Sequence, residues 1–234
     1  MIFYFLKDLF FPKFCLQCYH PGSYLCQNCQ KQLIYLRNQR CFYCKKPSPY
    51  SLTHQKCLKS FYIDQVGSIF VYNNLLKKII KNIKYRFATE VFKELTLIID
   101  PKKINTLSFY KNLSGNITIQ PIPLHKNKYK KRGFNQAYLI SLYLQKFLNF
   151  PIVDYLERVK ETKNQAEIKE KKQRYQNLKG AFKIRQNLKQ DELKNLKIIL
   201  VDDIITTGYT ANEAAKTLKK AGCEKVYLFS LAQG

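Results

Sequence analysis

Acidic residues, glycine, proline and long apolar runs are all scarce in this chain of 234 residues. No apolar run approaches the ~20 residues that a membrane-spanning helix needs, so we expect no membrane span. The apolar start also lacks the basic stretch and the small-residue cleavage site of a secretory signal, so we expect a cytoplasmic protein. With 46% hydrophobic and 24% charged residues, the composition excludes a disordered or fibrous chain.

The scarcity of acidic residues leaves a large positive charge. Lys and Arg number 41 against 16 Asp and Glu, a formal net charge of +25. A basic surface attracts phosphate, and therefore nucleic acid. However, Lys outnumbers Arg by 34 to 7, a skew that an AT-rich coding sequence would produce without any anionic ligand. The net charge therefore supports an anionic partner only weakly, and local clusters carry more information.

Cysteine is concentrated at one end of the chain. Seven of the eight Cys lie between residues 15 and 57. They form three Cys-x-x-Cys pairs and one pair that begins with His: Cys15 and Cys18, Cys26 and Cys29, Cys41 and Cys44, His54 and Cys57. Four thiolates, or three with one imidazole, complete the shell of a structural Zn²⁺. The pairs therefore predict two structural zinc sites, formed by neighbouring pairs or, with interleaved loops, by crossed pairs.

These cysteines define the expected domains. Residues 1–60 have too little apolar content for a core of their own, so zinc is expected to hold them as a small zinc-ribbon module. Residues 61–234 are expected to form the second domain. Cys223 lies outside the pairs and is expected to be buried near a helix end.

The second domain has the alternating pattern of an α/β fold. Its predicted strands cover residues 66–72, 117–122, 198–201 and 225–230, and its predicted helices cover residues 75–84, 89–99, 135–148 and 209–221. The last strand, turn, helix and strand form a βαβ unit, which requires parallel strands. We therefore expect a Rossmann-like, mainly parallel sheet.

A candidate ribose-phosphate site follows the strand predicted at residues 198–201. Asp202 and Asp203 would lie at the carboxyl edge of the sheet, where carboxylates can accept hydrogen bonds from neighbouring sugar hydroxyls. Hydroxyls and backbone N–H groups at the start of a helix then form a cradle for a phosphate dianion. The residues of this cradle are Thr206, Thr207, Gly208 and Thr210. The alternative, a Mg²⁺ or phospho-acceptor site at the two Asp, gives no reason for the Thr-rich turn.

This segment resembles the phosphoribosyl pyrophosphate (PRPP) signature of type I phosphoribosyltransferases. Two further stretches, residues 120–125 (Gln-Pro-Ile-Pro-Leu-His) and 131–137 (Lys-Arg-Gly-Phe-Asn-Gln-Ala), are similar to a signature of the ComF family. The spacing of Arg158, Thr162 and Gln165 fits the same family, as do the cysteine pairs. The sequence departs from the family pattern at His54, where the family usually has Cys. Because histidine also binds zinc, the change keeps a zinc ligand.

The resemblance implies a type I phosphoribosyltransferase-like fold that binds PRPP together with Mg²⁺. Residues 124–133 would form the loop that faces the pyrophosphate, and residues 158–174 a mobile loop that closes over the ligand. Arg132 is our candidate for a direct pyrophosphate contact, because its guanidinium fork suits two phosphate oxygens. Lys84, which follows the first long helix, is a further candidate.

Two functions fit these features. A phosphoribosyltransferase would release pyrophosphate from PRPP, although the sequence identifies neither a general acid or base nor a nucleobase pocket. The ComF family is also associated with competence, the uptake of single-stranded DNA. The same fold would then serve as a non-catalytic single-stranded DNA-binding or adaptor protein that works with competence proteins, since basic segments with interleaved aromatics suit single strands.

Overall fold

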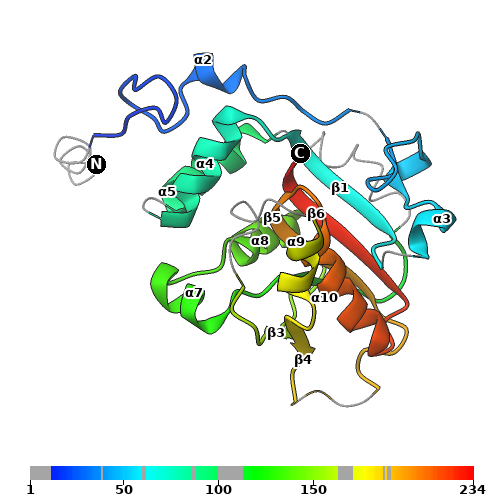
Figure 1. The fold of residues 1–234 in the computed structure, drawn as a ribbon. Coiled ribbons are helices and arrows are strands. Elements are labelled where there is room, and N and C mark those ends of the chain that lie inside the picture. Colours follow the sequence, from blue (N-terminus) through cyan, green and yellow to red (C-terminus); the bar gives the residue numbers. More distant parts are fainter. Residues whose placement is uncertain are drawn as a thin grey trace.

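A central parallel sheet organises the protein (Figure 1). The computed structural model describes residues 12–37, 39–59, 62–85, 88–99, 113–162, 171–186, 188 and 191–234. The sheet has the strand order β1–β6–β5–β2, and all three pairings are parallel. Its strands are β1 (Gln65–Val71), β2 (Ile117–Pro121), β5 (Lys197–Ile205) and β6 (Lys225–Gln233). The predicted α/β fold with a mainly parallel sheet is confirmed.

Helices cover both faces of this sheet. One face packs against α4 (Asn74–Tyr85), α5 (Ala88–Ile98) and α8 (Gln136–Leu148). The other face packs against α10 (Tyr209–Lys220). Along β5, Ile199 and Val201 point into the first layer, whereas Ile198 and Leu200 point into the second. A strand buried on both faces reads as a continuous apolar run, which is why this strand was visible in the sequence.

A small antiparallel pair lies beside the main sheet. It consists of β3 (Leu156–Arg158) and β4 (Phe182–Ile184). The helix α9 (Lys171–Leu178) precedes β4, and both elements contact α10. The sequence did not predict these two strands, because three residues are too few to show a period.

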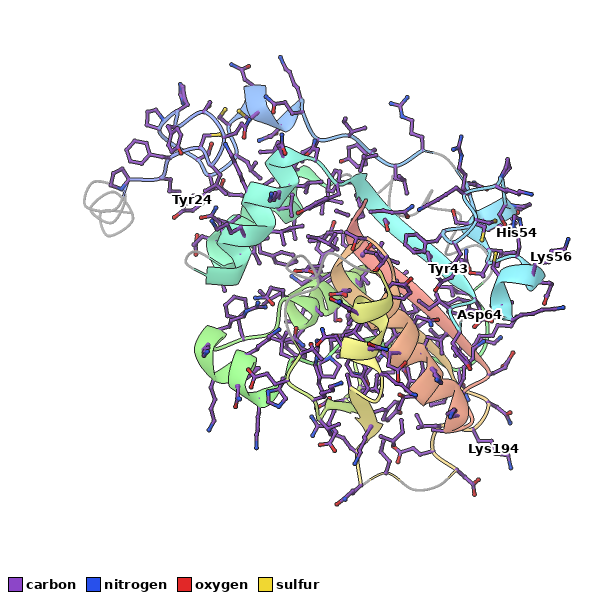
Figure 2. All side chains as sticks on the ribbon, viewed as in Figure 1. Tyr24, Tyr43, His54, Lys56, Asp64 and Lys194 are labelled. Carbon is purple, nitrogen blue, oxygen red and sulfur yellow. The ribbon has the colours of Figure 1, made fainter. Side chains whose placement is uncertain are left out.

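The cysteine-rich segment packs on both sides of the sheet. It includes the short helices α2 (Gln27–Gln30), η1 (Pro49–Ser51) and α3 (Gln55–Leu58). Tyr24 and Leu25 belong to the core around α4 and α5, whereas Phe42 belongs to the core around α10. Figure 2 shows Tyr24 beside α5 and His54 beyond β1, at the other end of the molecule.

The segment that joins the two cysteine groups covers the edge strand β1. Tyr35 forms an antiparallel bridge with Phe70, and Leu36 N–H donates to the carbonyl oxygen of Ile69 at 2.8 Å. Further along, the N–H of Thr53 donates to the carbonyl oxygen of Asp64. These contacts pair an edge that would otherwise expose its backbone groups. The domain boundary near residue 60 stays a prediction.

One predicted loop is a helix. Residues 124–133, expected as a loop, contain α7 (Lys126–Arg132). Its N-cap is His125, whose ring nitrogen accepts from the N–H of Asn127, and its C-cap is Gly133 in the left-handed region at φ 77°. Helical periodicity was hidden because five of the seven residues between these caps are basic. Among the described residues, no helix combines the length and apolar character that crossing a membrane requires.

Candidate functional site

Two carboxylates lie at the carboxyl end of β5. The strand continues past residue 201, where its end was predicted, because β6 runs alongside it as far as Gln233. Asp202 and Asp203 are therefore the last polar residues of the strand, and both are half-buried. Each carboxylate accepts the next backbone N–H at 2.8 Å, from Asp203 and Ile204 respectively. These bonds orient the carboxylates, and a carboxylate can accept more than one hydrogen bond.

The turn after β5 leads directly into α10. Gly208, in the left-handed region at φ 73°, is the N-cap of the helix. Thr206 is exposed, while Thr207 and Thr210 are half-buried. The first N–H groups of a helix lack partners within that helix and carry positive partial charge. The predicted Thr-rich cradle is thus placed at a helix N-terminus, within a few residues of the two carboxylates.

Arg132 differs from the other basic residues of α7. It is half-buried, and its guanidinium donates to the amide oxygen of the buried Gln136 at 3.2 Å. Three other basic side chains of the helix are exposed to solvent, those of Lys126, Lys130 and Lys131. The helix therefore turns one guanidinium inward and leaves most of its ammonium groups in solvent.

Arg158 joins this site, although the sequence assigned it no individual role. Burial lowers the pKa of Arg158, the nearby Asp202 carboxylate raises it, and the nearby Arg132 guanidinium lowers it again. An arginine remains protonated despite such shifts. The three charges come from β3, α7 and β5, so the fold brings together groups that are far apart in the sequence.

The surroundings of Arg158 hold its guanidinium in place. One terminal nitrogen donates to the hydroxyl of the buried Thr162, and the guanidinium lies 5.4 Å from the ring centroid of Phe182. The Nε of Arg158 is buried without a hydrogen-bond partner. Buried donors are nearly always satisfied in folded proteins, so this one is available to an acceptor such as a phosphate oxygen.

The segment after Arg158 is fastened to α7. Lys128 Nζ donates to the carbonyl oxygen of Thr162 at 2.9 Å, and the amide of Asn127 donates to Glu161. His125 Nδ1 lies 3.9 Å from Glu161. The two basic segments that were expected to flank the ligand therefore contact each other. Of the predicted mobile loop at residues 158–174, residues 163–170 lie outside the described residues, and residues 171–174 belong to α9. The side chain of Lys84, the other candidate, also lies outside the described residues.

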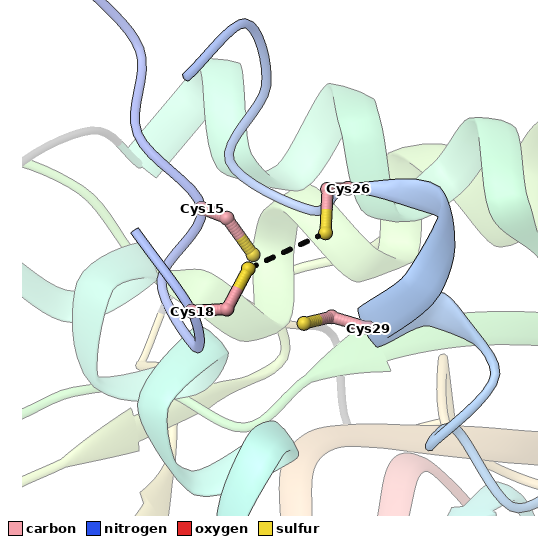
Figure 3. Close-up of side chains that lie close together, drawn as sticks. All are labelled: Cys15, Cys18, Cys26 and Cys29. Carbon is pink, nitrogen blue, oxygen red and sulfur yellow. Dashed lines mark hydrogen bonds between the residues drawn. The ribbon is translucent and has the colours of Figure 1, made fainter. Parts of the chain in front are cut away.

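The first cysteine group gathers four sulfurs (Figure 3). Its members, whose sulfurs all lie within 4.8 Å of one another, are Cys15, Cys18, Cys26 and Cys29. The sulfurs of Cys18 and Cys26 are 3.6 Å apart. Tetrahedral zinc with Zn–S bonds of about 2.3 Å separates its sulfurs by about 3.8 Å. The donor set and its spacing therefore fit a closed Zn–Cys₄ site.

The second group gathers Cys41, Cys44 and Cys57 within the same limit. His54 stands at its edge, with Nδ1 3.1 Å from the sulfur of Cys44 and Nε2 3.1 Å from the carbonyl oxygen of Pro47. A ligating histidine usually donates its other ring N–H to such an oxygen. His54 therefore has the surroundings of a fourth ligand, and both groups, formed by neighbouring pairs, could hold zinc.

Within each group, backbone N–H groups favour a thiolate at one cysteine. Burial raises the pKa of Cys15, but N–H groups of Cys18, Cys26 and Gln17 more than offset it and lower the pKa to about 6. Burial raises the pKa of Cys29 to about 12. Such N–H groups directed at sulfur suit a metal-bound thiolate, because metal binding displaces the thiol protons.

Cys223 is buried after the end of α10, as expected. Its N–H donates to the carbonyl oxygen of Leu218, and it belongs to the core that includes Leu218 and Val226. Burial raises the pKa of Cys223 to about 12, although Lys219 opposes this. The thiol is thus neutral at physiological pH and packs as a small apolar side chain.

Comparison with known proteins agrees with this geometry. Residues 130–234 match the family model of the phosphoribosyl transferase domain. The chain is 31% identical to competence protein F of Haemophilus influenzae, over 96% of this chain and 98% of that protein. It is 26% identical to competence protein ComFC of Bacillus subtilis, over 86% of this chain and 80% of that protein. It is also 26% identical to DNA utilization protein YhgH of Salmonella typhimurium, over 95% and 97% of the two chains.

Proposed function

The chain belongs to the ComF family, and we propose that it binds PRPP, or a related ribose phosphate, with Mg²⁺ in support of DNA uptake. Asp202 and Asp203 hold the ribose hydroxyls, and the cradle formed by residues 206–210 holds the 5-phosphate. Arg132 and Arg158 hold the pyrophosphate, as guanidinium forks suit paired phosphate oxygens. The link to DNA uptake is taken from the names of the relatives, which are competence and DNA utilization proteins.

The observation that carries the proposal is the meeting of three charges. Arg158 is close enough to both Asp202 and Arg132 for each to shift its pKa. Two guanidinium groups outnumber the one carboxylate beside them, so this part of the protein favours an added anion. A carboxylate beside that pair suits the polar sugar that joins the two phosphate ends of PRPP.

The proposed metals differ in role. Two structural Zn²⁺ ions would hold the groups around Cys15 and Cys41, where no coordination position is left open for chemistry. The carboxylate oxygens of Asp202 and Asp203 are of the kind that Mg²⁺ prefers, together with the oxygens of the phosphates. Bound Mg²⁺ would neutralise charge on the pyrophosphate. The residues of the chain itself bind and orient the ribose and its phosphates.

The test is a calorimetric titration with PRPP in the presence of Mg²⁺. Replacing both carboxylates, Asp202→Asn with Asp203→Asn, should abolish detectable binding. The exposed Asp191 provides the matched control, and Asp191→Asn should bind like the wild type. Unchanged affinity in the double variant would show that the site is wrongly assigned. Pyrophosphate release on adding nucleobases or amines would extend the proposal from binding to phosphoribosyl transfer.

A second candidate function is supported by exposed aromatics near the basic helix. Tyr129 on α7 is 52% exposed and Tyr138 on α8 is 47% exposed. Lys126, Lys130 and Lys131 are exposed on α7 as well. Aromatic faces beside a positive surface bind single-stranded nucleic acid by stacking and charge. This chain would then bind single-stranded DNA on the side of the molecule that carries the proposed PRPP site, with or without catalysis.

A further inference from the structure

The phosphate cradle contacts the second cysteine group through one aromatic ring. A Cβ placed on Gly208 would lie only 2.9 Å from Cε1 of Phe42. Phe42 stands between Cys41 and Cys44, inside the tight turn that carries the first two sulfurs of the group. Position 208 therefore requires glycine for two reasons. Its backbone is in the left-handed region at φ 73°, and the ring of Phe42 leaves no room for a Cβ.

Phe42 is buried and tightly surrounded. It is 4% exposed and shares a core with Ile205 and Ala211, which lie on either side of the cradle in sequence. The ring of Tyr43 meets it edge to face at 5.3 Å, and Lys45 Nζ lies 4.3 Å from its centroid. Close-packed side chains transmit displacement because interiors have little free volume. A shift of this ring would therefore move the turn at Gly208.

The cysteine group sets the position of the ring. The N–H of Cys41 donates to the carbonyl oxygen of Lys46 at 2.9 Å. The turn is closed by the N–H of Lys45, which donates to the carbonyl oxygen of Cys41 at 2.9 Å. An ion bound by Cys41 and Cys44 would fix the backbone on both sides of Phe42. Without the ion, the turn would lose the link between its two sulfurs.

The first cysteine group has no such connection among the residues that the structure describes. Leu16 occupies the matching place, between Cys15 and Cys18, and packs against the core on the opposite side of the sheet. That core contains α4, α5 and α8 but neither Ile205 nor Ala211. The chain thus carries its own control, because two metal groups of similar construction differ in their contact with the cradle.

We propose that Phe42 is a positioning residue that couples the second zinc site to the ribose-phosphate cradle. The inference rests on the proposed function and on zinc in the second group. Zinc holds the turn at residues 41–44, the ring of Phe42 holds the turn at Gly208, and the cradle is ready for the phosphate. Because coupling between two binding sites is reciprocal, a bound ribose phosphate also strengthens the second zinc site.

The first experiment compares Phe42→Ala with Leu16→Ala. Both variants are first checked for zinc content and melting temperature, and PRPP with Mg²⁺ is then titrated by calorimetry. Couplings between sites usually amount to a roughly 5–150-fold change in affinity, so we expect Phe42→Ala to weaken PRPP binding about tenfold. Leu16→Ala should stay within about twofold of the wild type, and Phe42→Leu should recover part of the loss. Equal affinity in the Phe42 and Leu16 variants at full zinc content overturns the inference.

The second experiment uses the unaltered protein, so that it does not depend on how a variant folds. The zinc-loaded chain is exposed to a chelator and an alkylating reagent, with and without PRPP and Mg²⁺, and labelling is followed by mass spectrometry. PRPP should slow the labelling of Cys41 and Cys44 about tenfold and leave Cys15 and Cys18 unchanged. Equal slowing of both groups, or none, overturns the coupling. A wild-type chain that binds no PRPP instead overturns the proposed function itself, which separates the two failures.

Discussion

At the scale of single residues, Arg158 is the strongest test of the site. Its guanidinium is fixed by Thr162 and Phe182 and carries a buried Nε without a partner. Arg158→Lys keeps the charge but removes the fork. Hydrogen bonds to charged groups contribute about 1.5–3 kcal/mol, so PRPP affinity should fall by roughly tenfold to a hundredfold, measured by calorimetry with Mg²⁺ present.

The control for this prediction is Arg185. Its Nε is likewise buried without a hydrogen-bond partner, but the side chain is half-exposed and pairs with Asp154 at 2.8 Å. It follows β4 in the same small sheet. Exposed ion pairs contribute about 0–1 kcal/mol to stability, so Arg185→Lys should change neither stability nor PRPP affinity noticeably. A similar loss of affinity in both variants would mean that the loss does not come from a specific contact between the Arg158 guanidinium and PRPP.

Single residues also show how much of the candidate site could be predicted from the sequence alone. The run from Asp202 to Thr210 was interpretable because the residues of the proposed ribose-phosphate site are neighbours in the chain. The surroundings of Arg158 could not be predicted in this way. Asp202 and Arg132 approach it only after β3, β5 and α7 have packed. The same holds for Phe42, whose contact with Gly208 joins two distant segments.

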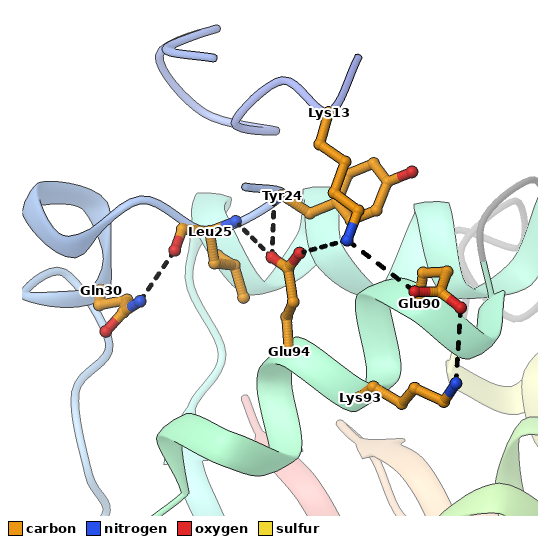
Figure 4. A network of polar contacts seen from close by, with 7 residues as sticks. All are labelled: Lys13, Tyr24, Leu25, Gln30, Glu90, Lys93 and Glu94. Atoms are coloured by element: carbon orange, nitrogen blue, oxygen red, sulfur yellow. Dashed lines mark hydrogen bonds and ion pairs between the residues drawn. The ribbon is translucent and has the colours of Figure 1, made fainter. Parts of the chain in front are cut away.

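At the scale of elements, Glu94 of α5 fastens the first cysteine group to the core (Figure 4). Its carboxylate accepts the N–H groups of Tyr24 at 2.7 Å and Leu25 at 3.1 Å, and pairs with Lys13 at 3.7 Å. Glu94→Ala leaves two partly buried N–H groups without that acceptor. We expect a loss of about 2 kcal/mol in the free energy of unfolding, measured by urea titration with zinc present.

The same helix offers a matched control. Glu90 lies one turn earlier, is more exposed, and forms surface ion pairs with Lys13 at 3.9 Å and Lys93 at 3.5 Å. Glu90→Ala should cost less than about 0.5 kcal/mol. Equal losses in the two variants would mean that the bonds to Tyr24 and Leu25 do not stabilise the docked segment.

Elements were predicted from the sequence with uneven success. The buried strand at β5 was visible as a continuous apolar run, and the helix at α10 was visible because its apolar residues repeat with a helical period. By contrast, the segment of α7 was predicted to be a loop, because five of its seven residues are basic and only its capping residues indicate a helix. The docking of the two cysteine groups on opposite faces was not predicted either, because the spacing of ligands says nothing about the surfaces they contact.

At the scale of the whole molecule, the net charge of +25 has to be separated from its distribution. Lys130 and Lys131 are exposed on α7, which is tied to the segment after Arg158. Lys220 and Lys225 are equally exposed, but they lie at the end of α10 and the start of β6. These two pairs are therefore at opposite edges of the sheet, and replacing either pair by Gln removes the same charge.

This pairing tests single-stranded DNA binding at the basic helix. If α7 contacts the strand, Lys130→Gln with Lys131→Gln should weaken binding of an oligothymidylate several-fold at moderate salt. It should also reduce the slope of log affinity against log salt, by roughly 0.7 for each phosphate that the helix no longer neutralises. Lys220→Gln with Lys225→Gln should leave the slope unchanged, because the strand does not reach that edge of the sheet. Equal effects of the two double variants, measured by fluorescence anisotropy over a salt series, would show that DNA responds only to the net charge and would remove α7 from the binding surface.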